Sequence, residues 1–182
     1  YLIEENKMNI AILFNLIRKE IVDENKPLDL IAELDSKETI QAEKKAFEEA
    51  GHKVILIEAD ENAYIKLKKQ RKKIDIVFNV AEGTHGEARR SQIPGMLEML
   101  KIPCAGSDAL TQALCLDKAM AKRIMIQHGI PTPRFQVIEK VNEKIDDLKF
   151  PLILKLAHEG SQMGLDKNSV VENHYLLRKK LK

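Results

Sequence analysis

N-I-A-I-L-F, residues 9–14, is a short run whose residues are all apolar except the first, Asn9. Two runs of the same kind follow, K-V-I-L-I-E-A at 53–59 and I-D-I-V-F-N-V at 74–80. Such runs are typical of strands that helices cover on both faces. Helix-forming stretches separate them, and residues 102–105 offer a short fourth strand. This alternation predicts an α/β fold with a largely parallel sheet.

Helix start and stop signals lie between the predicted strands. Asp35 and Ser36 are residues that cap a helix, and Gly51 is a typical residue just past a helix end. Helices are also expected at 62–73 and 93–100. A polar loop with two glycines, A-E-G-T-H-G-E-A-R-R at 81–90, follows the third strand. The loop therefore lies at the carboxyl end of the sheet, where open α/β sheets bind ligands.

A second unit begins near Asp117. The stretch D-K-A-M-A-K-R-I-M-I-Q-H-G has helical spacing and ends at a glycine, and P-T-P at 131–133 then fixes an extended connection. The remaining pattern predicts strands at 134–139, 152–156 and 169–171, a short helix near 143–148, and a helix from 173 to 182. A polar, glycine-bearing loop fills 158–167.

Composition limits the function classes. The 182 residues carry 30 Lys and Arg against 28 Asp and Glu, so a net charge of +2 gives no basic field for nucleic acid. The chain has no apolar run of membrane-spanning length, so no membrane partner is expected and the cytoplasm is the default location. Cys104 and Cys115 fit neither a metal site nor a disulfide framework.

The segment K-L-A-H-E-G-S-Q-M-G-L, at 155–165, is the most informative one chemically. A lysine at a strand end followed by a small-residue loop suits a polyphosphate, because glycines let backbone amides approach the oxygens. The pattern is neither the P-loop nor the dinucleotide fingerprint. Taken alone, it also fits a strand-ending lysine followed by a surface hairpin.

Two further segments have a functional and a simpler interpretation. Asp117 can cap a helix while Lys118 is merely solvated, or Lys118 can hold an anion. In the 81–90 loop, Glu82 and Glu87 can act as bases or bind an amine, although a charged loop is usually a solvated one. His85 is equally ambiguous.

The order of these motifs together is specific. V-F-N-V-A-E-G, Q-I-P-G-M-L-E-M-L-K-I-P-C-A-G-S, L-D-K, G-I-P-T-P and F-P-L-I-L-K with E-G-S-Q-M-G-L follow one another along the chain. This series resembles the D-alanine–D-alanine ligases of the ATP-grasp superfamily. The resemblance runs from about residue 9 to the end and is densest between 77 and 171.

The resemblance implies a Rossmann-like pre-ATP-grasp domain at 8–107 and the first, central α+β subdomain of an ATP-grasp fold, truncated, at 108–182. It implies an ATP-dependent ligase that joins a carboxylate to an amine through an acyl phosphate. ATP and Mg²⁺ are the expected cofactors, and the metal ligands are expected beyond the end of this chain. The chain alone is therefore expected to be inactive. A homodimer is expected from the resemblance only.

By the same resemblance, site residues are assigned in both parts of the chain. Ser161 is the candidate catalytic residue, because it helps bind the substrate and position the loop. The expected ATP-binding residues are Lys118, Lys155, Glu159, Gly160, Ser161, Gln162 and Gly164. The expected substrate-binding residues are Glu38, Glu82 and Gly83.

The chain departs from the family pattern at several positions. F-N-L-I-R-K-E replaces a glycine-rich turn, Glu82 replaces a histidine, and Gln162 replaces a second serine. Glu38 is the counterpart of the amine-binding glutamate. These changes favour another amino-acid or peptide-like substrate over D-alanine. Two alternatives remain: a non-catalytic binding module with the same fold, and a Rossmann-like nucleotide-binding protein, which requires the missing glycine-rich turn after Phe14.

Overall fold

The computed structural model describes residues 7–17 and 32–182. The chain divides into two compact units, residues 1–113 and 114–182. The division falls within helix α4 (Ala109–Leu116), which begins where Asp108 Oδ1 accepts the backbone N–H of Thr111 at 2.7 Å. Each unit has its own sheet, and each is described separately below.

The first unit contains a four-stranded parallel sheet. Its strands are β1 (Asn9–Phe14), β2 (Lys53–Glu58), β3 (Ile76–Asn79) and β4 (Cys104–Ala105), in the order β2-β1-β3-β4. In the middle of β1, Ile12 lies opposite Leu56 on one side and Phe78 on the other. The predicted α/β fold with a parallel sheet is confirmed, including the short fourth strand.

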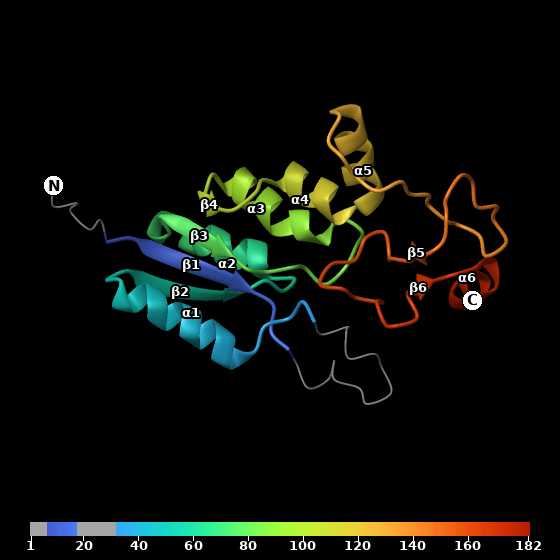
Figure 1. Cartoon of the computed structure of the whole chain (residues 1–182). Helices are drawn as coiled ribbons and strands as arrows, with labels where there is room; N and C mark the ends of the chain where they lie inside the picture. Colours follow the sequence, from blue (N-terminus) through green and yellow to red (C-terminus); the bar gives the residue numbers. More distant parts are fainter. Residues whose placement is uncertain (1–6, 18–31) are drawn as a thin grey trace, which may run out of the picture. The chain divides into compact units, whose positions relative to one another are not determined.

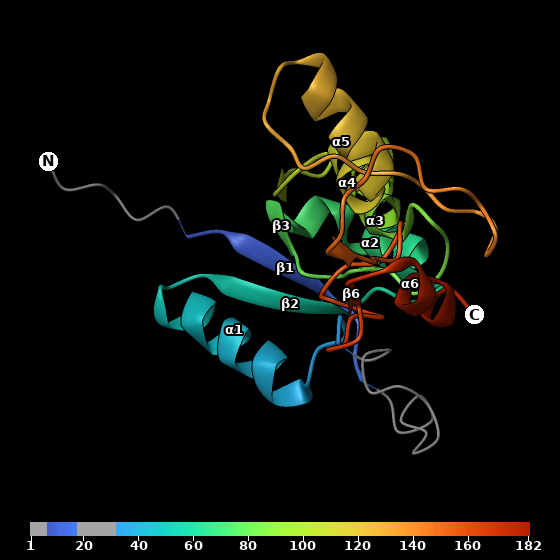
Figure 2. The ribbon, with the colours of Figure 1, turned by 45° about the vertical axis from the view of Figure 1, so that its right-hand side comes forward.

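Helices cover both faces of this sheet (Figure 1). α1 (Lys37–Glu49) lies on one face, and α2 (Ala63–Gln70) and α3 (Gln92–Leu100) lie on the other, an arrangement that the turned view keeps (Figure 2). Successive side chains of a strand point to opposite faces. Ile12 and Phe14 therefore pack with Ile40 of α1, whereas Ala11 and Leu13 pack with the second helical layer.

The helix boundaries follow local chemistry. The Ser36 side chain accepts the backbone N–H of Thr39 and caps α1. At the other end Gly51 has φ +86°, and the N–H of His52 returns to the carbonyl of Phe47, so the predicted stop signal is confirmed. α3 ends in the same way, but Lys101 takes the left-handed conformation there with φ +53°.

The connections place a ligand-binding edge between β1 and β3. The β1–β2 connection carries α1 over one face, while the β2–β3 connection carries α2 over the other and continues through the 3-10 helix η2 (Arg71–Lys73). The path therefore changes direction between β1 and β3, which is the point where open α/β sheets bind ligands at their carboxyl end. The loop that leaves β3 includes the 3-10 helix η3 (Arg89–Ser91).

The second unit is smaller and contains α5 (Lys118–Gln127), β5 (Leu152–Ile153), β6 (Val170–Val171) and α6 (His174–Lys180). β5 and β6 pair antiparallel, and Val171 and Leu177 are its buried apolar residues on β6 and α6. Asp117 caps α5 by accepting the N–H groups of Ala119 and Met120 at 2.9 and 3.0 Å.

Two predicted elements of the second unit are wrong. Residues 134–139 form no strand, and residues 143–148 form no helix. The Gln136 side chain explains the difference: its amide donates to the carbonyl of Lys144 at 2.7 Å and accepts the N–H of Asp146 at 2.9 Å. The Gln136 side chain thus supplies to the 144–146 backbone the hydrogen bonds that a neighbouring strand would otherwise supply.

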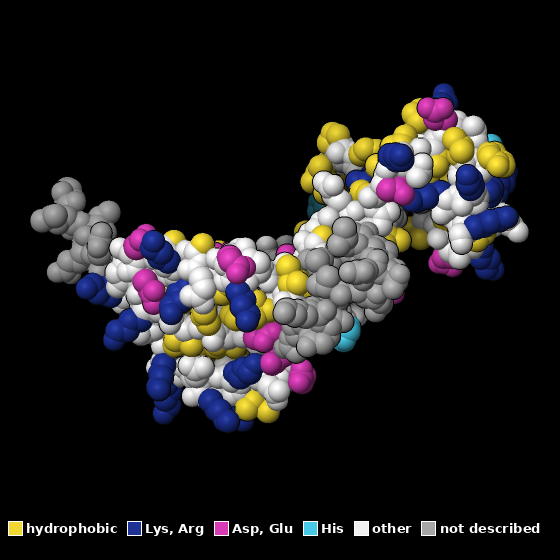
Figure 3. Space-filling view, turned by 90° about the horizontal axis from the view of Figure 1, so that it is seen from below, with side chains coloured by type: hydrophobic (Ala, Val, Ile, Leu, Met, Phe, Trp, Pro, Cys, Tyr) yellow, Lys and Arg dark blue, Asp and Glu magenta, His cyan; other side chains and the backbone are white. Residues whose placement is uncertain are grey.

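The surface of the described residues is mixed in charge. On the face shown in Figure 3, Lys and Arg side chains lie among Asp and Glu side chains rather than forming one continuous basic area. Within the described parts of the chain, every helix is too short or too polar to cross a bilayer.

Candidate functional site

Asn15 connects the carboxyl ends of three neighbouring strands. It directly follows β1 and is 4% exposed. Its Nδ2 donates to the carbonyl of Ala59, just past β2, at 2.9 Å, and its Oδ1 accepts the N–H of Gly83, in the loop after β3, at 3.0 Å. The 81–90 loop is thus tied to the central strand.

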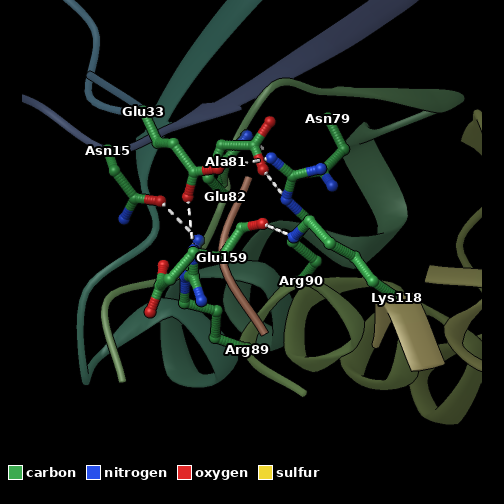
Figure 4. A network of polar contacts seen from close by, with 10 residues as sticks. Asn15, Glu33, Asn79, Ala81, Glu82, Arg89, Arg90, Lys118 and Glu159 are labelled. Carbon is green, nitrogen blue, oxygen red and sulfur yellow. Dashed lines mark hydrogen bonds and ion pairs between the residues drawn. The ribbon is translucent and has the colours of Figure 1, made fainter. Parts of the chain in front are cut away.

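Glu33 forms the centre of an ion-pair network in the same loop region. One carboxylate oxygen accepts Arg89 at 2.5 Å and the other accepts Arg90 at 2.6 Å, and the Glu33 side chain is only 5% exposed. Arg90 also forms an ion pair with Glu82 through its Nε (Figure 4). Two carboxylates therefore balance two guanidinium groups, as buried charges require.

The network sets the protonation of its two glutamates in opposite directions. Burial acts to raise the pKa of Glu33, but the hydrogen bonds and charges of Arg89 and Arg90 outweigh it, so its pKa lies below the ordinary 4.5. Burial dominates at Glu82 and raises its pKa above 4.5, because Arg90 only partly offsets the loss of hydration. The negative charge of Glu33 adds to the increase.

Two further carboxyl groups lie close to this network. Burial raises the pKa of Asp35, whose backbone N–H donates to the carbonyl of Asn15 at 2.7 Å. Burial also raises the pKa of Glu43 on α1, and the charge of Asp35 raises it further. This edge of the sheet is therefore rich in carboxyl groups with shifted protonation.

Gly83 is required by the shape of the loop. Its φ is +74°, and a Cβ atom at this position would lie 2.6 Å from the carbonyl oxygen of Arg89. Only a residue without a Cβ fits such a close backbone approach. The Glu82-Gly83 pair is therefore held between Asn15 on one side and Arg89 and Arg90 on the other.

The structure separates the three predicted substrate-binding residues. Glu82 and Gly83 are neighbours in the network, whereas Glu38 is exposed in the first turn of α1. The N–H of Glu38 itself, together with Ser36, lowers the pKa of its carboxyl group. Glu33, which the sequence reasoning missed, is the glutamate that reaches the loop. Its only local signal is that it lies two residues before the helix-capping pair Asp35-Ser36.

In the second unit, the start of α5 lies against the predicted phosphate loop. The backbone N–H of Lys118 donates to the carbonyl of Ala157 at 3.0 Å, and its Nζ donates to the carbonyl of Glu159. His158 lies 3.5 Å from the Asp117 carboxylate. The pKa of Asp117 is lowered mainly by the hydrogen bond from the Met120 backbone N–H, which keeps the carboxylate charged.

The loop turns back through two strained residues. Ser161 and Gln162 both have positive φ, +43° and +63°, and the N–H of Met163 donates to the carbonyl of Gly160 at 2.8 Å. This pattern is that of a turn that usually contains glycine or asparagine. Gly164 follows with φ +72°. Strain of this kind occurs mainly at functional sites, where the surrounding structure maintains it.

Lys155 lies two residues after β5 and is exposed. Among the residues that the structure describes, none forms a hydrogen bond or ion pair with its ammonium group. Because Ala157 contacts the start of α5, Lys155, the 157–164 loop and Lys118 belong to one continuous region of the second unit. This region offers two lysines and a strained, glycine-bearing loop.

Comparison with known proteins identifies relatives of this chain. A curated D-alanine–D-alanine ligase B of Pseudomonas putida is 40% identical over 131 residues, which is 70% of this chain and 40% of the relative. An uncharacterized protein of Sinorhizobium fredii is 37% identical over 126 residues, 66% of this chain and 38% of that protein. The chain is similar to D-alanine–D-alanine ligases over part of its length.

The fold agrees with this likeness. The crystal structure of D-alanine–D-alanine ligase from Helicobacter pylori matches 96% of the chain and 62% of that protein, with a TM-score of 0.59 and 18% identity. The predicted fold class is thereby confirmed. The chain spans between 28% and 40% of the length of the curated relatives it matches. No protein-family model matches it.

Within residues 7–17 and 32–182, no three His, Cys, Asp or Glu side chains gather as metal ligands would. No residue of the described parts is therefore assigned to a metal.

Replacing Gly83 by alanine tests the close backbone approach in the loop. We expect Gly83→Ala to lower the free energy of unfolding by about 2–4 kcal/mol, because the left-handed φ and the contact with the Arg89 carbonyl both oppose a Cβ. Gly51→Ala is the matched control, since Gly51 has φ +86° but its nearest neighbour is a flexible lysine tip at 3.7 Å. Chemical denaturation of both variants measures the difference, and equal losses would contradict the steric argument.

The lowered pKa of Glu33 predicts a defined pH dependence. Ionised Glu33 stabilises the folded state above its unfolded pKa near 4.5, and this contribution is lost as the pH falls through the lower folded pKa. We therefore expect the free energy of unfolding to decrease more in the wild type than in Glu33→Gln between about pH 6 and pH 3. Urea unfolding across this range measures it. Parallel curves for the two proteins would show that Glu33 keeps its ordinary pKa.

Proposed function

We propose that this chain forms the amino-terminal and central parts of an ATP-dependent carboxylate–amine ligase. The observation that supports the proposal most directly is the second-unit region where Lys118 and the 155–164 loop meet. The ligase names of its relatives point in the same direction. Charge neutralisation of phosphate oxygens by fixed cations and amides is what phosphoryl transfer requires.

In this proposal, Lys118 and Lys155 hold the phosphates of ATP. Lys118 is fixed at the start of α5 through its backbone and its ammonium group, so it presents a positioned charge. Lys155 is exposed and available to move onto a phosphate. Residues Glu159, Gly160, Gln162 and Gly164 form the loop that covers the phosphates, and Ser161 contacts the reacting groups from the tip of its turn.

The reaction follows from these roles. A substrate carboxylate oxygen attacks the γ-phosphorus of ATP, the bond to the bridging oxygen breaks, and ADP leaves with that oxygen. An amine then attacks the acyl carbon, phosphate leaves, and the amine loses a proton. Mg²⁺ would neutralise charge on the phosphate oxygens, and we assign it no ligand among the described residues.

The substrate is bound at the carboxyl edge of the first sheet, by Glu82 and Gly83. Glu82 is half-buried and its pKa is raised, so its charge is sensitive to a neighbouring ligand. The many carboxyl groups at this edge favour a substrate with an ammonium group. An amino acid or a peptide fits this chemistry.

Removing either lysine tests the ATP site. We expect Lys118→Ala and Lys155→Ala to lower kcat/KM for ATP-dependent ADP release by at least about tenfold, because each loses a phosphate-contacting charge worth about 1.4 kcal/mol or more. Lys144→Ala is the control, since Lys144 is exposed and 3.8 Å from its nearest carboxylate. The assay uses the full-length protein that contains this chain, with amino acids and dipeptides as substrates. Unchanged rates in both lysine variants would overturn the assignment.

Replacing Glu82 tests the substrate side. We expect Glu82→His to change the order of preference among carboxylate substrates, because a carboxylate beside Arg90 is exchanged for an imidazole. Glu82→Gln is the control that keeps the shape and removes the charge. Relative kcat/KM values for a panel of amino acids measure the effect. A preference that stays the same in both variants would remove Glu82 from the substrate site.

A further inference from the structure

The backbone on each side of Glu82 is hydrogen-bonded to an asparagine side chain. The N–H of Ala81, the residue before it, donates to Oδ1 of Asn79 at 3.3 Å. The N–H of Gly83, the residue after it, donates to Oδ1 of Asn15 at 3.0 Å. The two asparagines follow or end neighbouring strands of the sheet, so the backbone on each side of Glu82 is fixed to the rigid part of the fold (Figure 4).

Of these two asparagines, Asn15 has the more strictly defined side-chain orientation. The Asn15 side chain uses its donor on the Ala59 carbonyl and its acceptor on the Gly83 N–H, and it is almost fully buried. An amide is the group that supplies both at one position. A rotated amide would place its NH₂ against the Gly83 N–H and its oxygen against the Ala59 carbonyl, and both contacts would be repulsive. The orientation is therefore unique.

The Asn15 backbone is also engaged. Its carbonyl accepts the N–H of Asp35, and the N–H of Ile17 donates back to the Asp35 carbonyl at 2.9 Å. The segment that carries Glu33 and Asp35 therefore meets the 81–90 loop through Asn15. A displacement of this residue would disturb both the hydrogen bond to Gly83 and the Glu33 contacts of Arg89 and Arg90.

We infer that Asn15 is a positioning residue, which fixes the direction of the Glu82 side chain and thereby sets the affinity of this edge for the substrate amino acid. The inference rests on the proposed function, because it assigns Asn15 to the substrate side of that site. Asn15 does not contact ATP in this assignment. Its loss must therefore act on substrate binding and leave nucleotide binding unchanged.

The test compares variants at the two ends of the same strand. Asn15→Leu keeps the branching of the side chain and removes both hydrogen bonds, and Asn15→Asp keeps the acceptor for Gly83 while losing the amide donor. Asn9→Ala is the matched control, because the Asn9 amide donates to Asp75 at the opposite end of β1. Steady-state kinetics give the KM for the amino acid and the KM for ATP separately. Hydrogen exchange of residues 81–90 without substrate gives the mobility of the loop.

For Asn15→Leu we expect the KM for the amino acid to rise by about tenfold, the KM for ATP to stay within about twofold, and backbone amides of 81–90 to exchange at least about fivefold faster. Asn15→Asp should show changes of the same kind, because a carboxylate oxygen would face the Ala59 carbonyl in place of the amide donor. It decides the question on these readouts if the Leu variant does not fold. Asn9→Ala should match the wild type.

Two results would overturn the inference. One is unchanged exchange in 81–90, and the other is a rise in both KM values together, which indicates a general loss of structure. Absence of ligase turnover in the full-length wild-type protein that contains this chain would instead contradict the proposed function. In that case the exchange experiment still decides on its own whether Asn15 fixes the loop.

Discussion

The position of β1 at the centre of the first sheet is the constraint on which the rest of the candidate site depends. β1 pairs in parallel on both sides, and its side chains are buried against helices on both faces. A strand held in this way has no freedom to shift its register, because a one-residue slip would turn its apolar side chains to the wrong layers. Asn15 directly follows this strand, and its position is therefore fixed as well.

The second requirement at this edge is charge balance. Arg89 is buried, and a buried guanidinium needs partners that match its charge. Glu33 supplies such a partner and shares its two oxygens between Arg89 and Arg90, while Arg90 continues to Glu82. The two positive and two negative charges of these groups balance. The loop therefore combines a rigid backbone with the carboxyl group of Glu82, whose raised pKa makes its charge responsive to its surroundings.

The second unit relies on more local features. Asp117 caps α5, the start of α5 holds the residues after β5, and the next turn contains two residues in the left-handed conformation. Non-glycine residues at such angles carry a cost of about 1 kcal/mol or more each. Their presence beside a helix start and two lysines is what makes this region a candidate phosphate site and not an ordinary hairpin.

The sequence by itself determined the elements whose signals are local. Apolar runs located the strands of the first sheet, and Ser36, Gly51 and Asp117 marked helix ends, because capping depends on residues within one turn. The Glu82-Gly83 pair was also visible as a polar turn after a strand. Only the tertiary structure decided that Glu33, and not Glu38, reaches this pair, since Glu33 is separated from its arginine partners by 56 and 57 residues. It also replaced the expected strand at 134–139 by contacts of the Gln136 amide, because a strand exists only where another segment offers hydrogen bonds.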